Sequence, residues 1–107
     1  MKPVKYDINA VCVIEEMTGM SIVRLFTDQS NIERISIVRK LYYAGRMADD
    51  KKLTLYAAGL ELQELIGAGE SLVDVVEKIT EGLMSTGIFP KPGDEAGEPE
   101  GNPTSPA

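Results

Sequence analysis

The stretch YDINAVCVIEEMTG, residues 6–19, decides whether the chain begins as a strand or as a helix. Apolar residues alternate from Val4 to Ile14, as in a strand. The same stretch also has a broad apolar helical face, made of Ile8, Val11, Cys12, Ile14 and Met17. The ends favour a helix, because Asp7 is a good N-cap and Gly19 suits a left-handed C-terminal cap. A short strand over residues 4–6 stays open as an alternative.

A second long helix is predicted over residues 30–45, after a short apolar turn, SIVRLF, that Ser21 would cap. Ser30 and Glu33 have the spacing of a capping box, and Gly45 would end the helix. Its main apolar stripe comprises Ile32, Ile35, Val38 and Tyr42. Ile37 and Leu41 lie off this stripe. Either the helix lies centrally in a bundle, or its extra apolar face binds a partner.

Two further helices follow a polar link at residues 46–52. Thr54 would cap the first, in which Gly59 predicts a close helix crossing. Its apolar face comprises Leu55, Ala58, Leu62, Leu65 and Ile66. Ser71 and Asp74 would cap the last helix, which ends at Gly87. Its stripe comprises Leu72, Val75, Val76, Ile79 and Leu83.

The C-terminal segment, residues 90–107, differs sharply in composition from the rest of the chain. It holds five of the six prolines, and its only basic residue is Lys91. Such a Pro/Gly/acidic segment has too little apolar surface to offset its ordering entropy. We therefore predict a disordered tail after one all-α domain, residues 1–89, built from about four main helices and a short helical turn.

The totals argue against several classes of function. With 17 acidic and 11 basic residues the net charge is -6, which disfavours binding to nucleic acid or anionic lipid. No apolar run reaches membrane-spanning length, so we expect a cytoplasmic, soluble protein. The chain contains no histidine, the commonest general base and metal ligand.

No group of residues stands out as a catalytic or metal site. Cys12 has no histidine to activate it and no second cysteine, so we expect it to fill the core. Glu15 and Glu16 are neighbours on a helix and therefore point in different directions. We expect neither an enzyme nor a cofactor.

A small DNA-binding regulator is an alternative, because five basic residues cluster in an acidic chain: Arg39, Lys40, Arg46, Lys51 and Lys52. Asp49 and Asp50 interrupt this cluster, and the link from Gly45 to Leu53 is long for a helix-turn-helix. A protein-binding function is favoured over this alternative.

The sequence resembles the tail assembly chaperones of long-tailed bacteriophages and related gene-transfer particles. In YDINAVCVIEEMTGMS the matching positions are Tyr6, Asp7, Asn9, Ala10, Glu15, Glu16, Gly19 and Ser21. In VRKLYYAGRMADDKKLTLYAAGLELQELI they are Arg39, Leu41, Ala44, Gly45, Leu53 and Thr54. Together the similar regions span about residues 4–89. The chain departs from the pattern at Arg46, Cys12 and Val13, where the family favours apolar or bulkier residues.

The resemblance implies a non-catalytic morphogenesis factor that keeps the tape measure protein soluble in the infected or lysogenic host's cytoplasm. It implies absence from the mature virion, and recruitment of tail tube protein, often through a longer frameshifted form. A structural head–tail connector subunit is a further alternative, and homo-oligomers are possible. For partner contact the sequence singles out five residues: Ile37, Leu41, Tyr43, Ile88 and Phe89.

Overall fold

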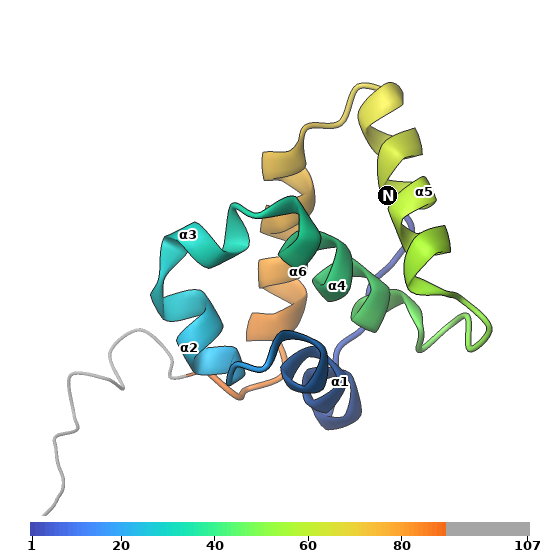
Figure 1. The fold of residues 1–107 in the computed structure, drawn as a ribbon. Coiled ribbons are helices and arrows are strands. Elements are labelled where there is room, and N and C mark those ends of the chain that lie inside the picture. Colours follow the sequence, from blue (N-terminus) through green and yellow to red (C-terminus); the bar gives the residue numbers. More distant parts are fainter. Residues whose placement is uncertain (90–107) are drawn as a thin grey trace, which may run out of the picture.

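A computed structural model describes residues 1–89 as an all-α fold (Figure 1). The helices in these residues are α1 (Ile8–Thr18), α2 (Ile22–Thr27), α3 (Gln29–Ile32), α4 (Ile35–Arg46), α5 (Leu55–Gly67) and α6 (Leu72–Met84). The predicted fold class is confirmed, with α1, α4, α5 and α6 as the four main helices. The segment predicted to be disordered, residues 90–107, lies outside the described residues.

The helix α4 occupies the centre of the fold, where α1, α3, α5 and α6 all contact it (Figure 1). Its fully buried side chains include Val38, Leu41 and Tyr42. This position explains why α4 is apolar on more than one face. Within residues 1–89, no helix is both long enough and apolar enough to span a bilayer.

Most of the predicted helix caps are confirmed. Asp7, Ser21 and Thr54 each accept a hydrogen bond from a backbone N–H in the first turn of α1, α2 and α5, respectively. Ser71 and Asp74 form the predicted capping box at the start of α6. Gly19 ends α1 in the left-handed conformation, with φ of 72°. These contacts need only residues adjacent in sequence, which is why the sequence predicts them.

The prediction of one continuous helix over residues 30–45 is wrong at its start. This part of the chain forms two helices, α3 and α4. Asp28 takes the N-cap position of α3, and the Ser30 hydroxyl donates to Asp28 instead of forming a box with Glu33. Arg34 then adopts an extended conformation, with φ of -83° and ψ of 125°. The break leaves Ile35 66% exposed, although it was predicted on the buried stripe.

The buried face of α1 also differs from the predicted one. Ala10, Val11 and Ile14 are buried, whereas Ile8 and Cys12 are exposed. Cys12 lies two residues from both Ala10 and Ile14, which places it about 200° from each around the helix. The prediction that Cys12 fills the core is therefore wrong.

Residues 1–7 carry no regular secondary structure, so the alternative strand over residues 4–6 does not form in this part of the chain. The segment still packs into the fold, where the Lys5 N–H donates to the carbonyl of Gly45 at 2.9 Å. A Cβ atom at Gly45 would lie 2.6 Å from Cζ of Tyr6 and 2.8 Å from Cβ of Val4. Gly45 lies inside α4 and does not end it as predicted; its role is to admit this N-terminal segment.

The helix α5 packs on α4, and Ala58 and Leu62 of its predicted apolar face are buried, but Ile66 is 50% exposed. A Cβ atom at Gly59 would lie 3.1 Å from Cδ of Arg39 on α4. The close approach predicted at Gly59 is thus a contact with a long side chain of the neighbouring helix. In α6 the predicted stripe is confirmed, with Val75, Ile79 and Leu83 buried and Leu72 and Val76 half-buried.

Candidate functional site

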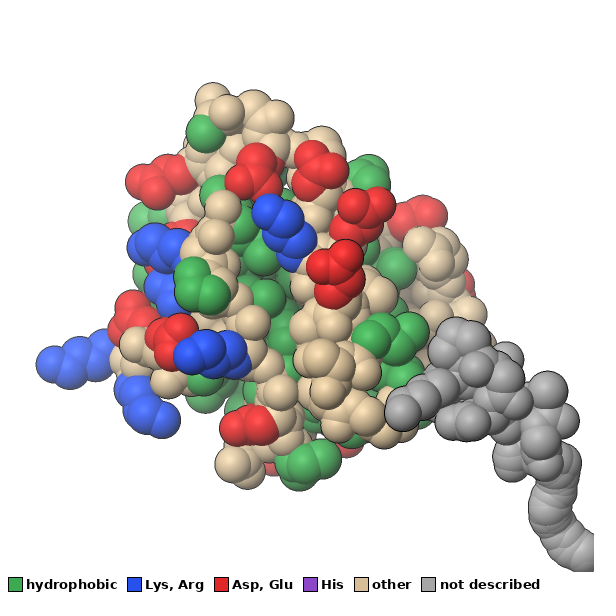
Figure 2. Space-filling model, turned by 180° about the vertical axis from the view of Figure 1, so that it is seen from behind, with side chains coloured by type: hydrophobic (Ala, Val, Ile, Leu, Met, Phe, Trp, Pro, Cys, Tyr) green, Lys and Arg blue, Asp and Glu red, His purple; other side chains and the backbone are tan. Residues whose placement is uncertain are grey.

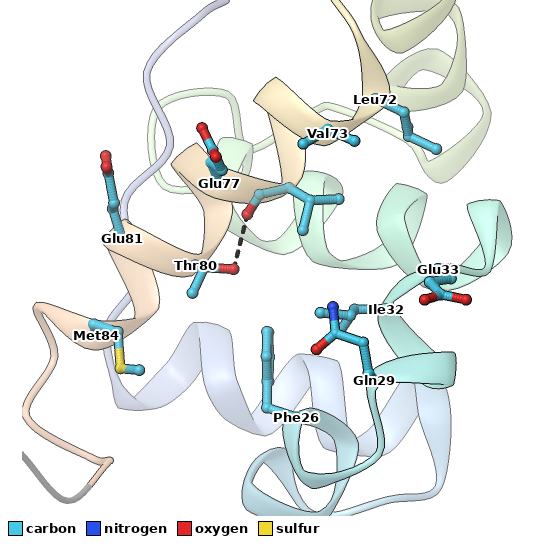
Figure 3. A pocket seen from close by; sticks show the side chains of 11 residues that line it. Phe26, Gln29, Ile32, Glu33, Leu72, Val73, Glu77, Thr80, Glu81 and Met84 are labelled. Atoms are coloured by element: carbon cyan, nitrogen blue, oxygen red, sulfur yellow. Dashed lines mark hydrogen bonds between the residues drawn. The ribbon is translucent and has the colours of Figure 1, made fainter. Parts of the chain in front are cut away.

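A groove runs between α6 on one side and α2 and α3 on the other, with a volume of about 880 Å³ (Figure 3). Its lining residues are Phe26, Gln29, Ile32, Glu33, Leu72, Val73, Val76, Glu77, Thr80, Glu81 and Met84. We call these eleven residues the α6 groove. A smaller hollow of about 260 Å³ continues it past Phe26, Thr80 and Met84 to Phe89.

The surface that lines the α6 groove is largely apolar. Val73 and Met84 are 67% and 54% exposed, and both belong to the wall that α6 contributes. The Thr80 hydroxyl donates to the carbonyl of Val76 at 2.8 Å, so its hydrogen-bonding capacity is directed back into the helix (Figure 3). Apolar side chains exposed together in a concave surface are typical of a protein-binding groove.

Carboxylates form the rim of the α6 groove. Glu77 and Glu81 extend from α6, and Glu33 lies across the gap beside α3 (Figure 3). On the rear face of the molecule, acidic side chains gather in the upper part, around a Lys or Arg side chain (Figure 2). No lysine or arginine lines the groove in residues 1–89, and no ion pair there involves these three carboxylates. The groove thus presents negative charge around an apolar floor.

The five residues singled out for partner contact are not brought together. Ile37 and Leu41 are 5% and 1% exposed in the core, so neither is available on the surface, in contrast to the expectation. Tyr43 is half-buried and packs against the same core. These residues are buried because α4 lies at the centre of the fold, where the neighbouring helices cover both of its apolar faces.

Ile88 and Phe89 are half-buried at the domain edge. The Phe89 ring meets that of Phe26 edge-to-face, with ring centroids 5.5 Å apart. Phe89 therefore forms the end wall of the smaller hollow, next to the α6 groove. Val73, Met84 and the acidic rim were not predicted. The available signal was the presence of apolar residues off the buried stripe of α6, interleaved with Glu77 and Glu81.

A buried polar cluster holds α4 against α5 on another side of the molecule. Arg46 is 5% exposed, and its Nε donates to Oε1 of Glu61 at 2.8 Å. The Tyr42 hydroxyl donates to the same carboxylate oxygen at 2.7 Å, and Lys2 reaches the other oxygen at 3.3 Å. Glu61 therefore balances the buried charge of Arg46.

The pKa shifts in this cluster favour the ionised pair. Hydrogen bonding from Arg46 lowers the pKa of Glu61 to about 2, against the opposing effect of burial. Hydrogen bonding to Glu61 raises the pKa of Arg46, and burial raises the pKa of Tyr42. Glu61 therefore stays a carboxylate at neutral pH and is a poor general base. In residues 1–89, no three acidic or cysteine side chains gather as metal ligands would.

Comparisons with known protein families, with curated proteins and with solved structures found no match.

Proposed function

We propose that this protein is a non-catalytic tail assembly chaperone of a long-tailed bacteriophage or a related particle. It would bind the tape measure protein and keep it soluble until tube subunits enclose it. The observation that carries this proposal is the apolar α6 groove, which has the shape and chemistry to receive one face of a helix. The resemblance to tail assembly chaperones, carried by the matched residues from Tyr6 to Thr54, suggests the tape measure protein as the partner.

The proposed mechanism is the covering of apolar surface. A helical tape measure protein exposes apolar side chains along its length before the tube surrounds it, and such surface promotes aggregation. Placing one of its faces against Phe26, Val73 and Met84 removes that face from water. Several copies bound along one tape measure chain would cover it, with or without contacts between the copies.

The wider assignment follows from the same proposal. The protein acts in the cytoplasm of the infected or lysogenic bacterial host and leaves the tail before the virion matures. Its second partner is the tail tube protein, which a C-terminally extended form would recruit. Phe89 lines the smaller hollow next to the α6 groove, so the described residues end near the proposed binding site.

The test is affinity purification of the tagged protein from cells that express its native gene neighbourhood, followed by mass spectrometry. Wild-type protein should retrieve a very long helical protein. The double variant V73D/M84D should retrieve at least about tenfold less, because it places charge on the apolar part of the α6 wall. Tyr56→Asp is the matched control, since Tyr56 is 72% exposed on α5, away from the groove.

Three results would contradict the proposal. The first is wild-type protein purified without a long helical partner, and the second is equal retrieval by V73D/M84D. The third is presence of the protein in purified particles, which would favour a head–tail connector subunit. Circular dichroism of V73D/M84D should match that of the wild type, because Val73 and Met84 are both more than half exposed.

A further inference from the structure

We infer that the α6 groove selects an amphipathic helix of another protein whose apolar face is flanked by lysine or arginine. This inference rests on the proposed function, because it specifies the chemistry of the helix to be covered. It follows from charge complementarity: three of the eleven lining residues, Glu33, Glu77 and Glu81, are carboxylates and none is basic. A helix with acidic flanks would place like charges side by side at the rim.

The rim also sets a spacing for the partner's basic residues. Glu77 and Glu81 are four residues apart on α6, so they lie one turn apart on the same side of the helix. A lysine or arginine pair at positions i and i+4 of the partner helix matches this separation. Glu33 lies on the opposite bank and pairs with a basic residue on the partner's other flank (Figure 3).

The length of the groove sets the size of the bound segment. The α6 wall extends from Leu72 to Met84, which corresponds to about 18 Å along a helix axis. About three turns of a partner helix lying along α6 cover this length. Apolar residues at i, i+3, i+4 and i+7 then contact the floor formed by Phe26, Ile32 and Val76.

Neither the chain's own C-terminal segment nor the exposed faces of α1 and α5 in a second copy have this chemistry. Residues 91–107 contain Asp94, Glu95, Glu98 and Glu100 against Lys91 alone, and no Leu, Ile, Val, Met or aromatic residue.

On α1 and α5 the exposed apolar lines also end in acids. On α1, Ile8 and Cys12 are followed one turn later by Glu16. On α5, Tyr56 and Leu60 are followed by Glu64. Each of these lines would bring a further carboxylate to the acidic rim, whereas a basic helix from a different protein complements it.

The experiment uses the full chain, labelled with ¹⁵N, and two synthetic 15-residue helical peptides. Both peptides carry leucine at the floor-facing positions; one has lysine and the other glutamate at the flanking positions. Amide chemical shifts are followed as each peptide is added. The lysine peptide should shift amides of residues 72–84 and 26–33 and bind at least about tenfold more tightly than the glutamate peptide.

Matched variants assign this preference to the rim. The double variant E77Q/E81Q should weaken lysine-peptide binding roughly fivefold to tenfold. The control E16Q/E64Q removes two exposed carboxylates outside the groove and should leave the preference unchanged. Raising the salt concentration should weaken only the lysine peptide, because exposed charge pairs are screened.

Equal binding of the two peptides would overturn the inference, as would absence of shifts at the groove or a preference that survives E77Q/E81Q. Nuclear Overhauser contacts from residues 90–107 to Val73 or Met84 would assign the groove to the tail. Groove shifts that depend on protein concentration alone would assign it to a second copy. If the peptides discriminate but the purification retrieves no tape measure protein, the groove specificity stands and the tail-assembly role falls. If the purification retrieves the tape measure protein but the two peptides bind equally, the tail-assembly role stands and the groove specificity falls.

Discussion

Replacing Glu61 with Gln should destabilise the fold by about 3 kcal/mol at pH 7. The amide keeps the shape of the side chain but removes the closer carboxylate partner of Arg46, which is 5% exposed, and leaves only Asp50 at 3.8 Å. The magnitude follows from the pKa of Glu61, which falls from 4.5 to about 2 on folding. At about 1.4 kcal/mol for each pH unit this corresponds to about 3 kcal/mol. Loss of one partner of a buried ion pair generally costs about 3–5 kcal/mol, which agrees.

The effect should depend on pH in a defined direction. Because folding lowers the pKa of Glu61, its stabilising contribution is complete above its unfolded-state value of 4.5 and disappears as the pH falls through about 2. The difference in unfolding free energy between the wild type and E61Q should therefore shrink to about 1 kcal/mol at pH 3. Urea titrations followed by circular dichroism at pH 7 and pH 3 measure both values.

The control is Glu64→Gln on the same helix, which removes an exposed carboxylate. It should change the unfolding free energy by no more than about 0.5 kcal/mol. The reasoning is refuted if E61Q is as stable as E64Q at pH 7. A loss of the same size at pH 7 and pH 3 would refute the assignment of the effect to the ionised carboxylate.

Three shorter predictions concern packing. Gly45→Ala should cost about 1–3 kcal/mol in urea titrations by displacing the N-terminal segment, while Gly67→Ala, which meets open space, should cost nothing. Cys12 should react with a chromogenic disulfide reagent in the native protein within about tenfold of its rate in the unfolded chain; strong protection would contradict its exposure. Ile37→Asp should abolish the cooperative thermal transition seen by circular dichroism, and Ile35→Asp should retain it.

Features that depend on neighbours in sequence were predictable. The caps at Asp7, Thr54 and Ser71 follow from the local competition for backbone N–H groups. The buried stripe of α6 follows from its helical periodicity. One local rule failed where two residues compete for one role. Both Asp28 and Ser30 are good caps, and Asp28 takes the position.

The rotation of α1 and the burial of Ile37 on α4 depend on packing. Sequence periodicity allows several apolar faces on α1, and contact with α4 selects the one that buries Ala10 and Ile14 and exposes Cys12. In the same way, α4 buries Ile37 because other helices surround it. An isolated helix has no preference between such faces, since burial gains free energy only where a partner surface exists.

The sequence by itself determined the all-α class, most helix starts and the buried stripe of α6, because these depend on interactions within a few residues. Only the tertiary structure decided the groove and the polar cluster. The α6 groove joins Phe26 to Met84, and the ion pair joins Arg46 to Glu61. Such sites depend on distances between elements remote in sequence, which helical periodicity does not encode.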